Sequence, residues 1–201
     1  MGGKKMKKFA VVLMLVGVVT LFGTTAQAGF VNPEENPSAA PFACQFSSPA
    51  NQHDWAFDYA GPTLILNESI HSASKDLVLM SGETDSDPIF TVYKTIENTS
   101  GITWTGYILT LSGGGGATFV QGTASARNGK LQTVNYIHPA AIKFSGPNSV
   151  KNGELLTLWF DINVPTSGLF NFSLTQEPVP EPATMALLGL GSLGLFYRRR
   201  A

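Results

Sequence analysis

Apolar and polar residues alternate along much of the chain between residues 89 and 176. In residues 155–164, LLTLWFDINV, an apolar side chain returns at every second position, and residues 89–98 and 169–176 repeat this pattern. Residues 102–111, ITWTGYILTL, place Trp104 on one face and Tyr107 on the other. A period of two is typical of half-buried strands in an antiparallel sheet.

Glycine, asparagine, proline and serine separate these segments at 98–101, 127–130, 145–148 and 151–153, where turns are expected. Shorter candidate strands lie at 63–66, 76–80, 117–121 and 131–137. The run Ser112–Gly116 predicts a hairpin tip. Seven to ten short strands without an amphipathic helix predict an all-β fold, a single antiparallel β-sandwich.

Composition sets the expected boundaries of this domain. Residues 29–50 are rich in proline, serine and alanine and are expected to form an irregular arm, followed by the sandwich at 51–175 and a linker at 176–182. Cys44 is the only cysteine, so no intrachain disulfide can form. A buried thiol is favoured over an intermolecular bridge.

The N-terminus predicts a signal peptide at 1–28. Four lysines precede the apolar stretch 9–22, and Ala26-Gln27-Ala28 forms an A-x-A site, so signal peptidase is expected to cut before Gly29. The alternative is a retained membrane anchor.

The C-terminus has a second apolar segment, within residues 183–201. Pro180 and Pro182 stiffen the chain, residues 183–197 carry no charge, and Arg198, Arg199 and Arg200 follow. As a helix the uncharged part would be roughly 22 Å long at about 1.5 Å per residue, against about 30 Å for a bilayer core. The segment predicts a short transmembrane helix. The alternative is a buried helix of a soluble domain.

Val179-Pro180-Glu181-Pro182, the apolar segment and the arginine cluster together resemble the PEP-CTERM sorting signal of Gram-negative bacteria. The resemblance implies processing by exosortase, a membrane-embedded cysteine transpeptidase that cuts near the Pro-Glu-Pro sequence and releases or re-anchors its substrate. Asn98, Ser100-Gly101, Trp104 and Tyr107 also resemble a pattern in the β-rich ectodomains of PEP-CTERM proteins. From the residues themselves, Asn98 and Gly101 are expected to set a hairpin turn, with Trp104 and Tyr107 beginning the return strand.

Charge agrees with export. The positively charged residues precede the N-terminal apolar segment and follow the C-terminal one, and positively charged flanks of this kind stay in the cytoplasm. Residues 29–182 hold six Lys and Arg against fourteen Asp and Glu, a net charge of −8. This charge disfavours nucleic acid as a partner. We expect transient anchoring in the inner membrane and then a location at the cell surface or in the extracellular matrix.

No cofactor is predicted. Glu83, Asp85 and Asp87 alternate in SGETDSDP, but Pro88 and Lys94 occupy the positions where an EF-hand needs glycine and glutamate. An acidic solvated loop is favoured, and a looser calcium site is the alternative. The three histidines lack the spacing of a zinc site.

No catalytic residue is predicted either. Asp54 and Asp58 lie beside aromatic residues and could form the carboxylate pair of a surface glycoside hydrolase. Trp55, Trp104 and Trp159 could stack on sugar rings, although such aromatics more often lie in the core.

The favoured hypothesis is an exported, non-enzymatic β-sandwich with a structural or adhesive role in an exopolysaccharide matrix or biofilm. The alternatives are a carbohydrate-binding module that binds this exopolysaccharide and, less favoured, the hydrolase.

Overall fold

The computed structural model describes residues 30, 32, 34–85, 88–114, 116–165 and 167–182. The predicted signal peptide with Ala26, Ala28 and Gly29, the C-terminal apolar segment with Arg198–Arg200, and Asp87 lie outside the described residues. The described part contains twelve strands and no helix, which confirms the all-β class. The strands are β1 (Ala43–Phe46), β2 (Gln52–Asp58), β3 (Thr63–Ile70), β4 (Asp76–Thr84), β5 (Ile89–Asn98), β6 (Trp104–Ser112), β7 (Thr118–Phe119), β8 (Ser125–Arg127), β9 (Thr133–His138), β10 (Ala141–Val150), β11 (Leu155–Asn163) and β12 (Gly168–Pro180).

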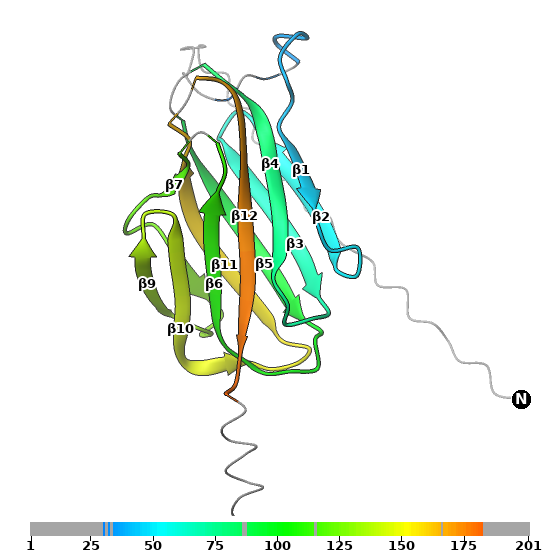
Figure 1. The fold of residues 1–201 in the computed structure, drawn as a ribbon, viewed down its shortest axis with the longest axis vertical. Helices are drawn as coiled ribbons and strands as arrows, with labels where there is room; N and C mark the ends of the chain where they lie inside the picture. Colours follow the sequence, from blue (N-terminus) through cyan, green and yellow to red (C-terminus); the bar gives the residue numbers. More distant parts are fainter. Residues whose placement is uncertain are drawn as a thin grey trace, which may run out of the picture.

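The strands form two six-stranded sheets that face each other (Figure 1). Sheet A has the order β1-β4-β12-β6-β10-β9. Sheet B has the order β2-β3-β5-β11-β7, with β8 also paired to β11. The sandwich is not antiparallel throughout, because β3 and β5 pair in parallel, Leu66 opposite Lys94. The chain leaves sheet B after β3, forms β4 in sheet A and returns as β5, and this crossover allows the parallel pair.

Alternating side chains from both sheets fill the space between them. In β11, for example, Leu156, Leu158, Phe160 and Ile162 are fully buried, as the period of two predicts. Aromatic rings dominate one part of this core. Phe42 stacks on Phe57 with ring centroids 4.0 Å apart, and the ring of Phe30 packs edge-on against that of Phe90 at 5.3 Å.

These contacts change the expected N-terminal boundary. The segment 29–50, predicted to be an irregular arm, contributes Phe30 and Phe42 to the core and forms β1 beside β4. The segment could not be recognised from periodicity because β1 has only four residues and the two phenylalanines lie outside any strand.

The C-terminal boundary also differs from the expected one. The predicted linker 176–182 begins inside β12, which continues to Pro180, and Gln176 is wholly buried. In Figure 1 β12 runs down the middle of sheet A with β4 and β6 on either side.

Two local expectations in β6 are corrected. Trp104 and Tyr107 do not lie on opposite faces, since both are fully buried with ring centroids 6.0 Å apart. The register of β6 shifts against both of its neighbours near Trp104, and such an irregularity turns a side chain to the other face. The run Ser112–Gly116 is not a hairpin tip, because it connects β6 in sheet A to β7 in sheet B.

Candidate functional site

The Pro-Glu-Pro sequence begins within the folded domain. Val179 pairs with Gly106 and Pro180 with Trp104, although the ladder is irregular between them. The hydroxyl of Thr105 lies 3.4 Å from the carbonyl oxygen of Val179 and 3.3 Å from that of Pro180, and it donates to both. One residue later the amide of Glu181 donates to the carbonyl of Thr103 at 3.0 Å. The first half of the motif is therefore held against β6.

Sheet A tolerates prolines here because β12 loses one neighbour. Its pairing with β4 ends at Gln176, whereas its pairing with β6 continues to Pro180. Residues 177–180 therefore form an edge, the position in a sheet where a residue without an N–H leaves no ladder bond unmade. Pro180 and Glu181 are exposed, and Pro178 is buried.

The described residues thus define a class: an all-β, two-sheet domain whose last strand ends at the first proline of a Pro-Glu-Pro sequence. The chain matches the family model of the PEP-CTERM protein-sorting motif over residues 178–200. This match confirms the predicted resemblance of the C-terminal segment to the PEP-CTERM sorting signal. The motif implies export, a membrane-anchored sorting signal and exosortase as the processing enzyme. No curated protein and no solved structure matches the chain. Within the part of the chain that the structure describes, no helix is long and apolar enough to cross a membrane.

The three tryptophans occupy different environments. Trp104 is fully buried, and its indole N–H donates to the hydroxyl of Ser100 at 3.1 Å. Trp55 is partly buried and packs against the core, with its ring 6.2 Å from that of Phe42. Only Trp159 lies on the outer face of sheet B, since it alternates with the buried Leu158 and Phe160.

Trp159 belongs to a row of side chains across the outer face of sheet B. Ile65 pairs with Tyr93, and Tyr93 pairs with Trp159. The rings of Tyr93 and Trp159 lie 4.9 Å apart, and the guanidinium of Arg127 lies 4.7 Å from the indole ring. Tyr93 approaches from β5 and Arg127 from β8, the neighbours of β11 on its two sides. Both flanks of the indole are therefore occupied, which leaves Tyr93 and Ile65 as the more accessible members, 38% and 44% exposed.

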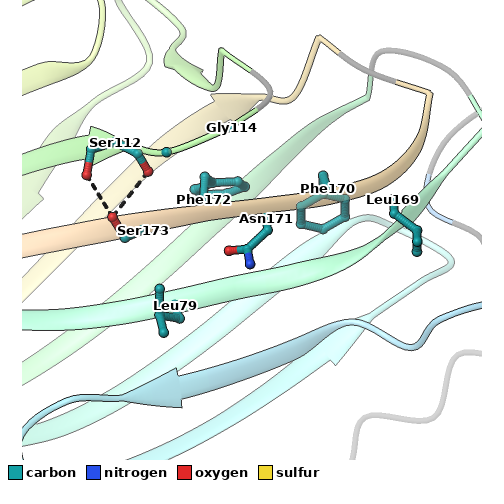
Figure 2. Close-up of a pocket in the computed structure, with 9 residues that line it drawn as sticks. Leu79, Ser112, Gly114, Leu169, Phe170, Asn171, Phe172 and Ser173 are labelled. Carbon is teal, nitrogen blue, oxygen red and sulfur yellow. Dashed lines mark hydrogen bonds between the residues drawn. The ribbon is translucent and has the colours of Figure 1, made fainter.

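A hollow of about 570 Å³ lies over sheet A, lined by residues of β4, β6 and β12. Figure 2 shows Leu79, Asn171 and Ser173 beside it, with the hydroxyls of Ser173 and Ser112 bonded to each other at 2.7 Å. Its lining contains no acidic, basic, histidine or cysteine side chain. The two serine hydroxyls of the lining bond to each other, and no acidic or basic side chain of the lining lies beside them to activate either one as a nucleophile.

A second hollow of about 360 Å³ lies where β2, β3 and β5 run side by side, and its lining includes Asp54, Asn67 and Glu97. The carboxylate of Glu97 accepts a hydrogen bond from Ser69 at 3.2 Å. Asp58, the other carboxylate considered for catalysis, is not part of this hollow and instead accepts the amide of Ala60 at 2.9 Å in the turn after β2.

The acidic loop is partly used for structure. The carboxylate of Glu83 accepts the amide of Ala40 at 3.0 Å and so holds the segment before β1 against β4. Asp85 follows at the end of β4. Among the described residues no group of three or more His, Cys, Asp or Glu side chains is arranged to hold a metal ion.

The histidines engage separate partners. His71 contacts the hydroxyl of Thr99 at 2.6 Å, and His138 accepts the amide of Ala140 at 3.2 Å. His53 is different: its ring is buried between the sheets and stacks on Phe46 with centroids 4.0 Å apart.

His53 belongs to a buried polar cluster that sequence analysis did not predict. Lys94 Nζ lies 2.5 Å from Glu68 Oε2, and neither side chain has any exposed surface. His53 Nδ1 lies 3.8 Å from Glu68 Oε1, and His53 Nε2 lies 3.4 Å from Asp76 Oδ2. Asp76 in turn accepts hydrogen bonds from Ser47 and Asn51 at 2.9 and 2.8 Å.

Burial shifts the acid–base properties of this cluster. It lowers the pKa of Lys94, and the nearby Glu68 carboxylate only partly opposes this shift. At Glu68 burial acts to raise the pKa, but Lys94 and His53 outweigh it and the pKa is lowered. Burial raises the pKa of Cys44 to about 12 and that of Tyr107 well above its usual range.

A signal for the cluster was present in the sequence. In IFTVYKTIEN, Lys94 shares its face with Phe90, Val92 and Ile96, which is an unusual position for a charge. The partners could not be inferred, because Glu68 and His53 come from other strands and Asp76 comes from the opposite sheet.

Proposed function

We propose that this protein is an exported, non-enzymatic surface protein with a structural or adhesive role in an extracellular matrix. The PEP-CTERM motif at residues 178–200 carries the proposal, because it implies export and exosortase processing. Continuity of the motif with a strand of sheet A supports a structural role, since any attachment made at the motif connects directly to the sheet. The net charge of −8 over residues 29–182 suits a soluble surface protein or one that meets cations.

Deletion of the gene in a strain that makes exosortase tests this proposal. A strain that lacks this protein should form a matrix of reduced mechanical strength or reduced cell adhesion. Wild-type protein supplied on a plasmid should restore the matrix. Normal cohesion and adhesion in the deletion strain would contradict the structural role.

Carbohydrate binding is the second candidate, and the outer row of sheet B favours it. Tyr93 and Ile65 present an accessible aromatic and apolar surface beside Trp159, a combination that suits stacking on sugar rings. Tyr93→Ala should then weaken saturable binding to purified exopolysaccharide. Phe57→Ala is unsuitable as a control because it disturbs the core, whereas Ile137→Ala changes an exposed residue on β9 of the other sheet. Equal binding by both variants, or no saturable binding by wild-type protein, would contradict this candidate.

A further inference from the structure

The pair Lys94–Glu68 does not have the geometry of an ordinary ion pair. At 2.5 Å its N···O distance is shorter than the usual 2.7–2.9 Å or so of an ammonium–carboxylate hydrogen bond. Among the described residues, the buried side-chain nitrogen and oxygen atoms that make no hydrogen bond all belong to Lys94, Glu68 and His53. The Lys94 amine and the Glu68 carboxylate are thus in direct contact in a dry interior, and neither makes a hydrogen bond of normal geometry.

This distance brings the reacting atoms together. Glu68 Cδ is bonded to Oε2 at about 1.23 Å, so Nζ can lie no more than about 3.7 Å from Cδ. This upper bound is close to the roughly 3–3.5 Å separation of a near-attack arrangement, and well-oriented intramolecular reactants reach effective concentrations of about 10⁵–10⁸ M. Parallel pairing of β3 and β5 fixes this approach, because Leu66 lies opposite Lys94 and Glu68 points inward two residues further on.

We propose that Lys94 and Glu68 become joined by an intramolecular amide bond that the folded protein forms itself. One proton passes from the Lys94 ammonium to Oε1 of Glu68, which gives a neutral amine and a carboxylic acid. The Nζ lone pair then adds to Cδ and forms the C–N bond. A second proton leaves Nζ, the Cδ–Oε1 bond breaks, and Oε1 departs as water. The sum is amine plus acid to amide plus water, with no oxidant, reductant or other reactant.

His53 is placed to move the second proton. Its Nδ1 faces Glu68 Oε1, the oxygen that departs, and its Nε2 faces Asp76. Asp76 is fixed by Ser47 and Asn51, and Phe46 holds the imidazole ring by stacking. A carboxylate–imidazole pair of this kind orients the ring and supports its positive charge during proton transfer.

The reaction also removes an electrostatic cost. Two buried charges lose much of their hydration, whereas an amide carries no net charge. The bond would close the chain between residues 68 and 94, including the β4 excursion into sheet A, in a protein that has only one cysteine. Such closure restricts the unfolded chain as a disulfide does.

Peptide mapping of the mature protein, purified from cells that export the full chain, tests the proposal. In a linear chain trypsin cuts after both Lys75 and Lys94. The amide removes the second cut and joins Asp76–Arg127 to the peptide that ends at Lys75, giving one branched species lighter than its parts by one water molecule. Separate peptides with a cut after Lys94, or a water loss at other residues, would overturn the proposal.

Two variants separate chemistry from folding. Lys94→Met combined with Glu68→Leu removes both charged groups together, which a core tolerates better than the loss of one, and should give two unlinked peptides from a folded protein. A branched species in this variant would overturn the assignment. His53→Gln should fold and form the bond roughly 100-fold more slowly, measured as loss of water after pulse labelling. An unchanged rate would overturn the role of His53.

Discussion

The buried side chain of Asn98 forms hydrogen bonds with backbone groups of two segments that are distant in sequence. Its amide nitrogen donates to the carbonyls of Ile102 and Val150 at 2.7 and 2.9 Å, and its side-chain oxygen accepts the amide and hydroxyl of Ser100. Gly101 follows with a φ of 77°, which glycine adopts without strain. The prediction that Asn98 and Gly101 set a hairpin turn is wrong: both residues shape the connection, but β5 lies in sheet B and β6 in sheet A, so β6 does not return along β5.

Asn98→Ala should lower the free energy of unfolding by about 2–3 kcal/mol, because it removes the donor to the buried carbonyl of Val150 and a second hydrogen bond to the carbonyl of Ile102. Asn98→Asp has the same shape but cannot donate when ionised, so it should destabilise the fold at least as much. Urea denaturation monitored by tryptophan fluorescence measures both changes. A loss below about 0.5 kcal/mol for Asn98→Ala would contradict the role given to this amide.

Cys44 faces the interior of the sandwich beside Met80 in the register of β1 and β4. Because burial raises its pKa to about 12, the thiolate fraction near neutral pH should be about a thousandfold below that of a free cysteine. We expect iodoacetamide to leave Cys44 unmodified in the folded protein and to alkylate it in urea. Rapid alkylation without urea, or a disulfide-linked dimer, would contradict its burial.

The connection from β6 to β7 shows how a loop can be constrained by a strand. A Cβ on Gly113 would lie 3.1 Å from the Cα of Phe172, and Gly113 has a φ of 118°. Gly113→Ala should therefore destabilise the protein by about 1–3 kcal/mol. Gly114→Ala is the matched control, because its nearest neighbour would be 3.8 Å away. Equal melting temperatures for the two variants would contradict the constraint.

Strand prediction succeeded where alternation was long and failed where it was interrupted. The predicted segment 89–98 coincides with β5, and residues 155–163 of the predicted segment 155–164 form β11. In contrast, β2 and β10 were not predicted. In β10 the hydrophobic alternation breaks near Gly146 and Pro147. In β2 the outward positions are mostly polar and one inward position is His53, so the inward Trp55 and Phe57 did not stand out as a strand pattern. The pairing of strands, including the parallel pair, depends on contacts distant in sequence and could not be read locally.

At the scale of the whole molecule, the fold limits where processing can occur. Gln176 is wholly buried and its side-chain oxygen Oε1 accepts a hydrogen bond from the hydroxyl of Tyr107 at 2.9 Å, while residues up to Pro180 pair with β6. Cleavage before Gln176 would remove this cover from the core. The mature C-terminus should therefore lie at Pro180 or beyond, as mass spectrometry of the exported protein can establish. A folded product that ends before Pro180 would contradict this limit.

The tail was predictable because its signal is local, with three unlike elements in order within residues 178–200. The interior of the domain was not predictable from local sequence. Trp55, Trp104 and Trp159, for example, lie in three different environments. Their environments are set by the position of each strand, the bulge in β6 and the neighbours across sheet B.

Processing at the Pro-Glu-Pro sequence is the central claim, and one comparison tests it most directly. Pro180→Ala combined with Pro182→Ala should leave the full-length protein in the membrane fraction, whereas wild-type protein should be shortened and leave it. Pro147→Ala, an exposed proline in β10 outside the motif, should behave as wild type. Fractionation followed by intact-mass measurement reads out all three. Normal shortening and release of the double variant would contradict the account.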